Sequence, residues 1–373
     1  DSQAAGGDVR WRRVCADLLA GVPPTGGLPG DDEVDAFLAV AREEGIAALL
    51  SHPSGEAQIN LPPALRDGLH QEARLQAMRD LARTVTTRET VAALADAGLE
   101  VLVLKGTALA QWLYPAPHLR PGSDVDLLVA DGAAAERAVD CLQPLGYRVL
   151  GGVRPAQSSD YEVALLDDTR RSLVVDLHWR LANHAALARG WTFAELRAQA
   201  RPLSTLHPRA MALGQVHALV HALVHRQSNL PSGSQDRLVW LYDLHLLAGR
   251  CTDADWQAFL RICDEKGIAR ACLDGLQASR QWLCTVIPGH VETALSRQAG
   301  ASSIHAVGGS DQGAMDRAHL RALRGRERWT WLWRKLLPPP AFMRHRYEVD
   351  GAWPLLWAYL RRWATGLRRA LGG

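Results

Sequence analysis

The sequence predicts an α+β protein in which a small mixed β-sheet lies between N-terminal and C-terminal helical regions. Of the 373 residues, 47% are apolar and 22% are charged, which is the balance of a globular protein with a sizeable core. Short apolar runs rich in Val and Leu occur between residues 99 and 181, whereas Leu and Ala at helical spacing dominate before and after them. This change of pattern places the sheet in the second quarter of the chain.

The order of these patterns divides the chain into four regions. We expect an N-terminal helical region over 1–90, an αβ core over 91–185, a helical domain over 186–300, and a loop with a basic, Trp-rich helical tail over 301–373. No apolar run reaches the roughly 18 to 20 residues that a membrane span requires. The first residues lack the basic and then apolar pattern of a secretory signal, so a cytoplasmic location is expected.

Helices are expected where apolar residues recur at helical spacing between start and stop signals. The predicted helices cover residues 31–45, 61–98, 107–114, 132–146, 193–200, 211–227, 236–250, 253–267 and 268–284. The predicted strands cover residues 99–106, 124–130, 147–151, 161–167 and 172–181. Residues 1–10 predict a tail, and 21–30 and 301–314 predict loops.

The strand over 124–130 carries two aspartates two positions apart. Because successive side chains of a strand alternate faces, Asp124 and Asp126 point the same way, and adjacent carboxylates repel each other unless a cation lies between them. Asp176 lies in another predicted strand among apolar neighbours, where an unpaired carboxylate is costly. If the two strands are adjacent, the three carboxylates converge. Oxygen ligands of this kind favour Mg²⁺ or Mn²⁺ over zinc.

The segment LKGT, residues 104–107, predicts a strand end, a glycine turn and a helix start upstream of these aspartates. The N-terminus of a helix offers free backbone N–H groups and a positive dipole end to a phosphate. Lys105 adds a charge there, and it is the only Lys among the first 265 residues of a chain that otherwise uses Arg. The segment therefore predicts a phosphate-binding turn.

Three segments follow one another in the chain: VLVLKGTALAQWLY, LRPGSDVDLLV and VVDLHWRL. In this order they resemble the uncharacterised nucleotidyltransferase group of the polymerase-beta-like superfamily. They correspond to a Lys-Gly turn, an R-x-x-(G/S)-D-x-D strand and a later acidic residue before His-Trp. The resemblance covers approximately residues 85–300, and it implies a nucleotidyltransferase core with a small mixed sheet flanked by helices and an added helical domain.

The resemblance also implies roles for single residues. Asp124 and Asp126 would hold two Mg²⁺ (or Mn²⁺) ions, and Asp176 would complete the site of the ion that activates the acceptor hydroxyl. Gly106 and Thr107 stand where the superfamily keeps a Gly-Ser phosphate turn, so Thr in place of Ser is a departure. The other residues implied on the nucleotide side are Lys105, Arg120, Gly122 and Ser123. For Arg120, an ion pair with Asp124 is the alternative.

Four side chains are candidates for the acceptor side: His178, His221, His225 and Asp243. His217, His221 and His225 recur every four residues on one helix face, where a metal site, a substrate-lining role and plain packing are all open, and packing is favoured. For Asp243 the alternative, which we favour, is a buried pair with Arg237 or with a His of the preceding helix.

A site of this kind implies attack by an acceptor hydroxyl on the α-phosphorus of a nucleoside triphosphate, with pyrophosphate leaving. The leading hypothesis is transfer of a nucleoside monophosphate, from ATP by default, to a hydroxyl of a small molecule or peptide, with natural-product tailoring suggested by the family. The alternatives are transfer to a protein hydroxyl in a toxin or antitoxin setting and a non-catalytic binding scaffold. No specific nucleic-acid motif is found.

The C-terminal end is strongly basic, because residues 317–373 hold 13 Arg or Lys against 3 Asp or Glu. An anionic partner is expected there first. After Pro354, a helix would place Leu355, Trp357, Leu360, Trp363 and Leu367 near one face. Both an interfacial membrane helix and a helix that packs its aromatic face on the domain fit this pattern, and packing is favoured.

Overall fold

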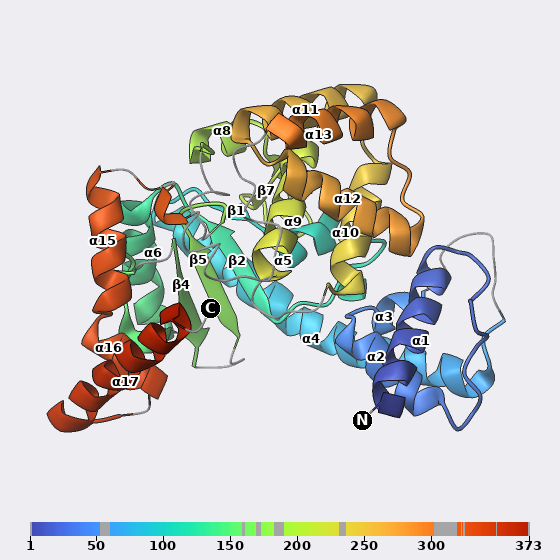
Figure 1. Ribbon diagram of the computed structural model, residues 1–373, viewed down its shortest axis with the longest axis horizontal. Helices are drawn as coiled ribbons and strands as arrows, with labels where there is room; N and C mark the ends of the chain where they lie inside the picture. Colours follow the sequence, from blue (N-terminus) through green and yellow to red (C-terminus); the bar gives the residue numbers. More distant parts are fainter. Residues whose placement is uncertain are drawn as a thin grey trace.

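The computed structural model describes residues 2–52, 60–158, 161–168, 173–182, 190–230, 236–301, 319–321, 323, 325–347 and 349–371. The described residues form one seven-stranded mixed sheet, and helices precede and follow it in the chain. Figure 1 shows the N-terminal helices at one end of the molecule and the last helices of the chain at the other. The α+β class predicted from the sequence is therefore confirmed.

The sheet has the strand order β3-β4-β5-β2-β1-β7-β6. The strands are β1 Leu102–Val103, β2 Asp124–Leu128, β3 Tyr147–Val149, β4 Glu162–Asp167, β5 Val174–His178, β6 Arg201–Pro202 and β7 Met211–Ala212. β2 and β5 run parallel at the centre, and their outer neighbours β1 and β4 pair with them in the antiparallel sense. All five predicted strands are present. The β6 and β7 strands were not predicted, because two residues are too few to show a period. Met211 and Ala212, predicted as the start of a helix, form β7 instead, and the helix begins at Gln215.

The N-terminal region is helical, as expected. Its helices are α1 Ser2–Leu19, α2 Val34–Glu43, α3 Ala47–Leu50 and α4 Pro63–Asp96. The prediction of a tail over residues 1–10 was wrong for residues 2–10, which belong to α1. Trp11, Val14 and Cys15 are buried in the core and anchor this helix. A glycine costs a helix only about 1 kcal/mol, so Gly6 and Gly7 do not end it.

The apolar face of the sheet packs against helices. The elements that connect the strands are the helices α5 Lys105–Trp112 and α6 Gly132–Leu142 and the short 3₁₀ turns η1 Pro117–Leu119, η2 Gln143–Leu145, η3 Leu150–Gly152 and η4 Pro155–Gln157. Val125, Leu127, Val175 and Leu177 are fully buried in a cluster that includes residues of α4 and α6. Because strand side chains alternate, the aspartates of β2 and β5 lie on the opposite face.

The helical domain comprises α8 Phe193–Ala198, α9 Gln215–Asn229, α10 Leu238–Gly249, α11 Asp253–Lys266, α12 Ala269–Leu283 and α13 Gly289–Ala301. Local signals explain its boundaries. At the start of α11, Thr252 and Asp255 form a capping box, and at its end Gly267 adopts a φ of 66°. Buried residues of α9 to α13 share one hydrophobic core with α1 and α2, including Trp11, Phe37 and Phe259.

The C-terminal helices are α15 Gly325–Leu336, α16 Pro340–Tyr347 and α17 Ala352–Leu371. They are attached to the sheet region, since Arg334 donates to the backbone oxygens of Ser158 and Ala156. The predicted packing of the aromatic face of the last helix was wrong, because Trp357 is 68% exposed and Trp363 is 44% exposed. Beyond Ala301, the loop predicted over 301–314 lies outside the described residues.

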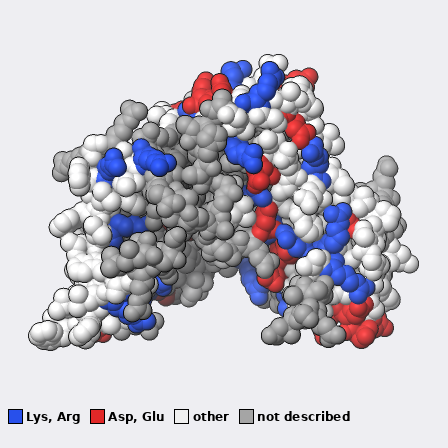
Figure 2. All heavy atoms as spheres, viewed as in Figure 1, with Lys and Arg blue, Asp and Glu red and all other residues white. Residues whose placement is uncertain are grey.

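The charged residues are unevenly spread over the molecule. In the face shown in Figure 2, red and blue side chains mix over the helical domain and the N-terminal helices, whereas the end formed by α15 to α17 is mainly white with blue patches. Within the described chain, no helix combines the length and the apolar character needed to cross a membrane.

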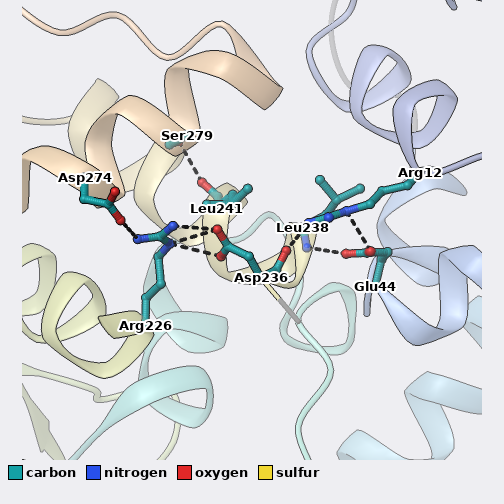
Figure 3. A network of polar contacts seen from close by, with 8 residues as sticks. All are labelled: Arg12, Glu44, Arg226, Asp236, Leu238, Leu241, Asp274 and Ser279. Atoms are coloured by element: carbon teal, nitrogen blue, oxygen red, sulfur yellow. Dashed lines mark hydrogen bonds and ion pairs between the residues drawn. The ribbon is translucent and has the colours of Figure 1, made fainter. Parts of the chain in front are cut away.

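A polar network holds the N-terminal helices against the helical domain (Figure 3). Glu44 is paired with Arg12 at 2.8 Å and accepts from the backbone N–H of Leu238 at 2.6 Å. Arg12 also donates to the backbone oxygen of Asp236, and the Asp236 carboxylate pairs with Arg226 at 2.6 Å. The network therefore fixes the first turn of α10, the helix that carries Asp243.

Candidate active site

Three carboxylates converge on the polar face of the sheet. The parallel register of β2 and β5 places Asp126 directly beside Asp176, and Asp124 lies two residues before Asp126 on the same face. Each of the three offers an oxygen, and these oxygens all lie within 4.8 Å of one another. The adjacency on which the expected convergence depended is thus present.

Asp126 is the buried member of this group, and two cationic or polar side chains hold it. Lys105 Nζ donates to Asp126 Oδ1 at 2.6 Å, and His178 Nε2 lies 3.0 Å from the same oxygen. Burial alone would raise the pKa of Asp126, but the Lys105 ammonium and the His178 hydrogen bond lower it below its ordinary value. Asp126 is therefore ionised over the whole physiological range.

Asp124 and Asp176 carry the unbalanced negative charge. Burial, followed by repulsion from Asp126, raises the pKa of Asp124. Burial, then Asp126 and then Glu162 raise the pKa of Asp176 to about 7. Two half-buried carboxylates that resist ionisation beside a third are the arrangement that a bound divalent cation relieves. The oxygen-only donor set fits Mg²⁺ or Mn²⁺.

The first turn of α5 brings Lys105 to the carboxylates. Lys105 has a φ of 50°, a strained value for a residue with a side chain. A Cβ on Gly106 would overlap the guanidinium of Arg120, with Cζ at 2.8 Å, so this position requires a glycine for space. Thr107 Oγ1 donates to the backbone oxygen of Asp124 at 3.1 Å and ties the helix start to β2.

Arg120 faces Asp243, not Asp124. Its Nη2 lies 2.7 Å from Asp243 Oδ2, its Nε donates to both carboxylate oxygens, and the Tyr114 hydroxyl donates to Oδ1 at 2.7 Å. Burial opposes the charge of Arg120, but Asp243 outweighs it and raises the pKa of the guanidinium. The favoured buried pair of Asp243 is thus present, but its partner is Arg120 and neither of the expected ones, Arg237 or a His of α9. Arg237 donates to the backbone oxygen of Glu43.

Comparison with known proteins identifies the group to which this site belongs. The profile of a family described as uncharacterised nucleotidyltransferase matches residues 30–284, which is more than half of the chain. The chain belongs to this family. The matched segment contains all seven strands and the three carboxylates. No curated protein matches the chain.

This nucleotidyltransferase is accordingly a transferase enzyme, and membership of the family implies a nucleotide substrate. The match ends close to the last residue of α12, so α13 and α15 to α17 lie beyond it. The acidic group gives the family assignment a chemical basis, since a nucleotidyltransferase must neutralise the charge of a triphosphate.

The histidines of α9 divide into two environments in the nucleotidyltransferase. His221 and His225 line a cavity of about 30 Å³ together with Lys105, Trp240 and Asp243. Burial and nearby charges lower the pKa of both imidazoles, that of His225 to about 3, so both are neutral.

His217 lies apart from these two histidines. It is buried, and the charges that act on it are those of Glu195 and Lys266. In the described chain, the metal-type cluster is formed by the three aspartates and includes no histidine.

Arg83 and Glu162 lie near the site but were not predicted from the sequence. The guanidinium of Arg83 packs directly against the predicted Gly122 and donates to the backbone oxygen of Arg120 at 3.1 Å. Arg83 lies within the long helix α4, and nothing in the local sequence of this helix distinguishes it from the other arginines there. Glu162 of β4 has Oε2 at 3.1 Å from His178 Nδ1, and strand alternation would have placed it on the polar face. Ser123 is exposed at the entrance to β2.

Proposed function

We propose that this nucleotidyltransferase is Mg²⁺-dependent, with Mn²⁺ as the alternative, and moves a nucleoside monophosphate from a triphosphate, ATP by default, to a hydroxyl of a small molecule or peptide. The observation that carries the proposal is the convergence of Asp124, Asp126 and Asp176. A scaffold has no use for three converging carboxylates of which Asp126 raises the pKa of the other two, whereas a two-ion site requires them.

The proposed roles are those that the resemblance to the family implies, and the positions on the two strands are compatible with them. Asp124 and Asp126, on β2, are proposed to bind both ions, and Asp176, on β5, is proposed to complete the site of the ion nearest the acceptor hydroxyl. Divalent ions at this site would stabilise the attacking and leaving oxygens. Asp176, with a pKa of about 7, is poised to bind a cation as a carboxylate at neutral pH. In the reaction the acceptor oxygen bonds to the α-phosphorus, and the bond between the α-phosphorus and the oxygen that bridges it to the β-phosphorus breaks. Pyrophosphate leaves with that oxygen, and the hydroxyl proton passes to solvent.

Lys105 is proposed to exchange partners when the substrate binds. In the free protein Lys105 Nζ lies 2.6 Å from Asp126 Oδ1 and compensates the negative charge of this carboxylate, which would otherwise require a bound cation. A divalent ion on Asp126 would release the ammonium toward the phosphates, for which Lys is a suitable point charge. Arg120 is already neutralised by Asp243, so we propose that it positions Gly106 and does not bind phosphate.

The test follows the α-phosphate. The protein is incubated with Mg²⁺, with each of the four ribonucleoside triphosphates labelled at the α-phosphate, and with an extract of its host. We expect label in an acceptor together with released pyrophosphate, and loss of both in Asp124→Ala. Asp168→Ala, which removes an exposed acid from an ion pair with Arg148, is the matched control. Transfer of the labelled nucleoside monophosphate by Asp124→Ala at the wild-type rate would contradict the two-ion proposal.

A further inference from the structure

The last two long helices expose tryptophans along single faces. On α15, Trp329, Trp333 and Leu336 are spaced three and four residues apart, and Trp329 is 73% exposed. On α17, Trp353 is 76% exposed, and Trp357 continues the same face. The exposed large apolar residues of the two helices, here called the tryptophan surface, are Trp329, Trp333, Leu336, Trp353, Leu356, Trp357, Leu360 and Trp363.

The two exposed faces meet where α15 ends. Trp363 Nε1 donates to the backbone oxygen of Leu336 at 2.7 Å, and Tyr359 of α17 donates to the backbone oxygen of Pro338 at 2.5 Å. Between α16 and α17 lies an apolar hollow of about 590 Å³, lined in part by Pro354, Trp357 and Leu360. A monomeric protein rarely leaves so many large apolar side chains together in water, so this surface calls for a partner.

The charge around the surface is positive. Arg328, Arg344 and Arg361 are exposed, and none of them forms an ion pair with a carboxylate in the part of the chain that the structure describes. Figure 2 shows this end of the molecule as mainly uncharged with blue patches. The last 57 residues carry a surplus of ten positive charges. The partner must therefore offer an apolar interior and a negative surface.

We propose that the tryptophan surface binds the face of an anionic lipid bilayer, with α15 and α17 lying in the interfacial plane. Trp and Leu on one side and Arg on the other are the composition of a helix that lies in this plane. The exposed arginines complement anionic headgroups, whereas binding to a second copy would bring like charges together. No described helix is long and apolar enough to cross the bilayer, so the attachment that we propose is peripheral.

The experiment uses the full chain and vesicles of two compositions. One is zwitterionic phosphatidylcholine, and the other contains phosphatidylcholine and phosphatidylglycerol at about three to one, since binding should increase with anionic lipid. Flotation in a density gradient measures the bound fraction. We expect binding to the anionic vesicles, accompanied by a blue shift of tryptophan fluorescence. Raising the salt to about 0.5 M should weaken it, because screening acts on exposed charges.

Two double variants distinguish binding through the tryptophan surface from nonspecific hydrophobic binding to vesicles. Trp353→Ser/Trp357→Ser should reduce binding to anionic vesicles roughly tenfold or more, with an unchanged melting temperature, because both side chains are exposed. Met78→Ser/Leu81→Ser removes two equally exposed apolar side chains from α4 and should bind like the wild type. Neither variant touches the carboxylates, so a failure of this proposal is independent of the catalytic one.

Three outcomes would overturn the inference. The first is absence of binding to anionic vesicles, and the second is equal loss in both double variants. The third is that the protein does not bind vesicles but forms a concentration-dependent dimer, and that the tryptophan double variant abolishes this dimer. That third result would assign the surface to a second copy of the chain.

Discussion

The Arg120–Asp243 pair gives the sharpest test of how the site is supported. The side chains of the two residues are 11% and 5% exposed, and Asp243 accepts hydrogen bonds from both Arg120 and Tyr114. Asp243→Asn leaves a guanidinium buried without its counter-charge. Removing one partner of a buried pair costs about 3–5 kcal/mol, whereas replacing both partners by apolar residues of similar size is often close to neutral. We therefore expect Asp243→Asn to be much less stable than Arg120→Met/Asp243→Leu.

Differential scanning calorimetry measures this difference. A loss of about 3–5 kcal/mol corresponds to a fall in Tm on the order of 5 °C or more for a chain of this size. Asp168→Ala, at an exposed ion pair, should leave Tm unchanged. If Asp243→Asn melts at the wild-type temperature but loses activity, Asp243 acts on the acceptor and the structural reasoning is wrong. A double variant that melts no higher than Asp243→Asn would equally contradict it.

Three further predictions concern the carboxylates and the turn. Asp124→Ala removes one of two repelling charges, so its Tm in chelator should equal or exceed that of the wild type; a clear fall would count against repulsion from Asp126. Burial and Asp126 raise the pKa of Asp176 from near 4 to about 7, so without metal the stability that its protonated carboxyl contributes is fully present below pH 4 and is lost as the pH rises through 7. Mg²⁺ binding at pH 7 should therefore release about half a proton. Calorimetry in buffers of different ionisation enthalpy measures this release, and a result of no release would refute the prediction. Gly106→Ala should lower stability by about 1–3 kcal/mol through the clash with Arg120, and an unchanged Tm would show that the guanidinium moves freely.

The acidic group was predictable because its geometry is local. A strand alternates its faces whatever the fold around it, so the spacing of Asp124 and Asp126 fixes their common direction. Asp176 needed one additional fact, the pairing of β2 with β5, which an αβ pattern suggests but does not prove. Strand and helix periods likewise gave the α+β class, since they depend on residues that are close in sequence.

Contacts between distant segments were not predictable in the same way. Asp243 lies 123 residues after Arg120, and nothing in the local pattern of either segment distinguishes this arginine from Arg237 as its partner. The exposure of Trp357 is a similar case, because an amphipathic helix shows its apolar side in the sequence but not what covers that side. Both depend on how complete elements pack.

The network around Glu44 has a consequence for the limits of the folded unit. Sequence comparison recognises a segment that begins at residue 30, after the whole of α1. Yet Arg12 of α1 pairs with the buried Glu44, and Trp11 packs edge to face on Phe37 with ring centroids 5.8 Å apart. A fragment cut at residue 30 would keep all three catalytic candidates while exposing this core and leaving a buried carboxylate without its arginine. The packed unit therefore extends beyond the segment that the family comparison matches.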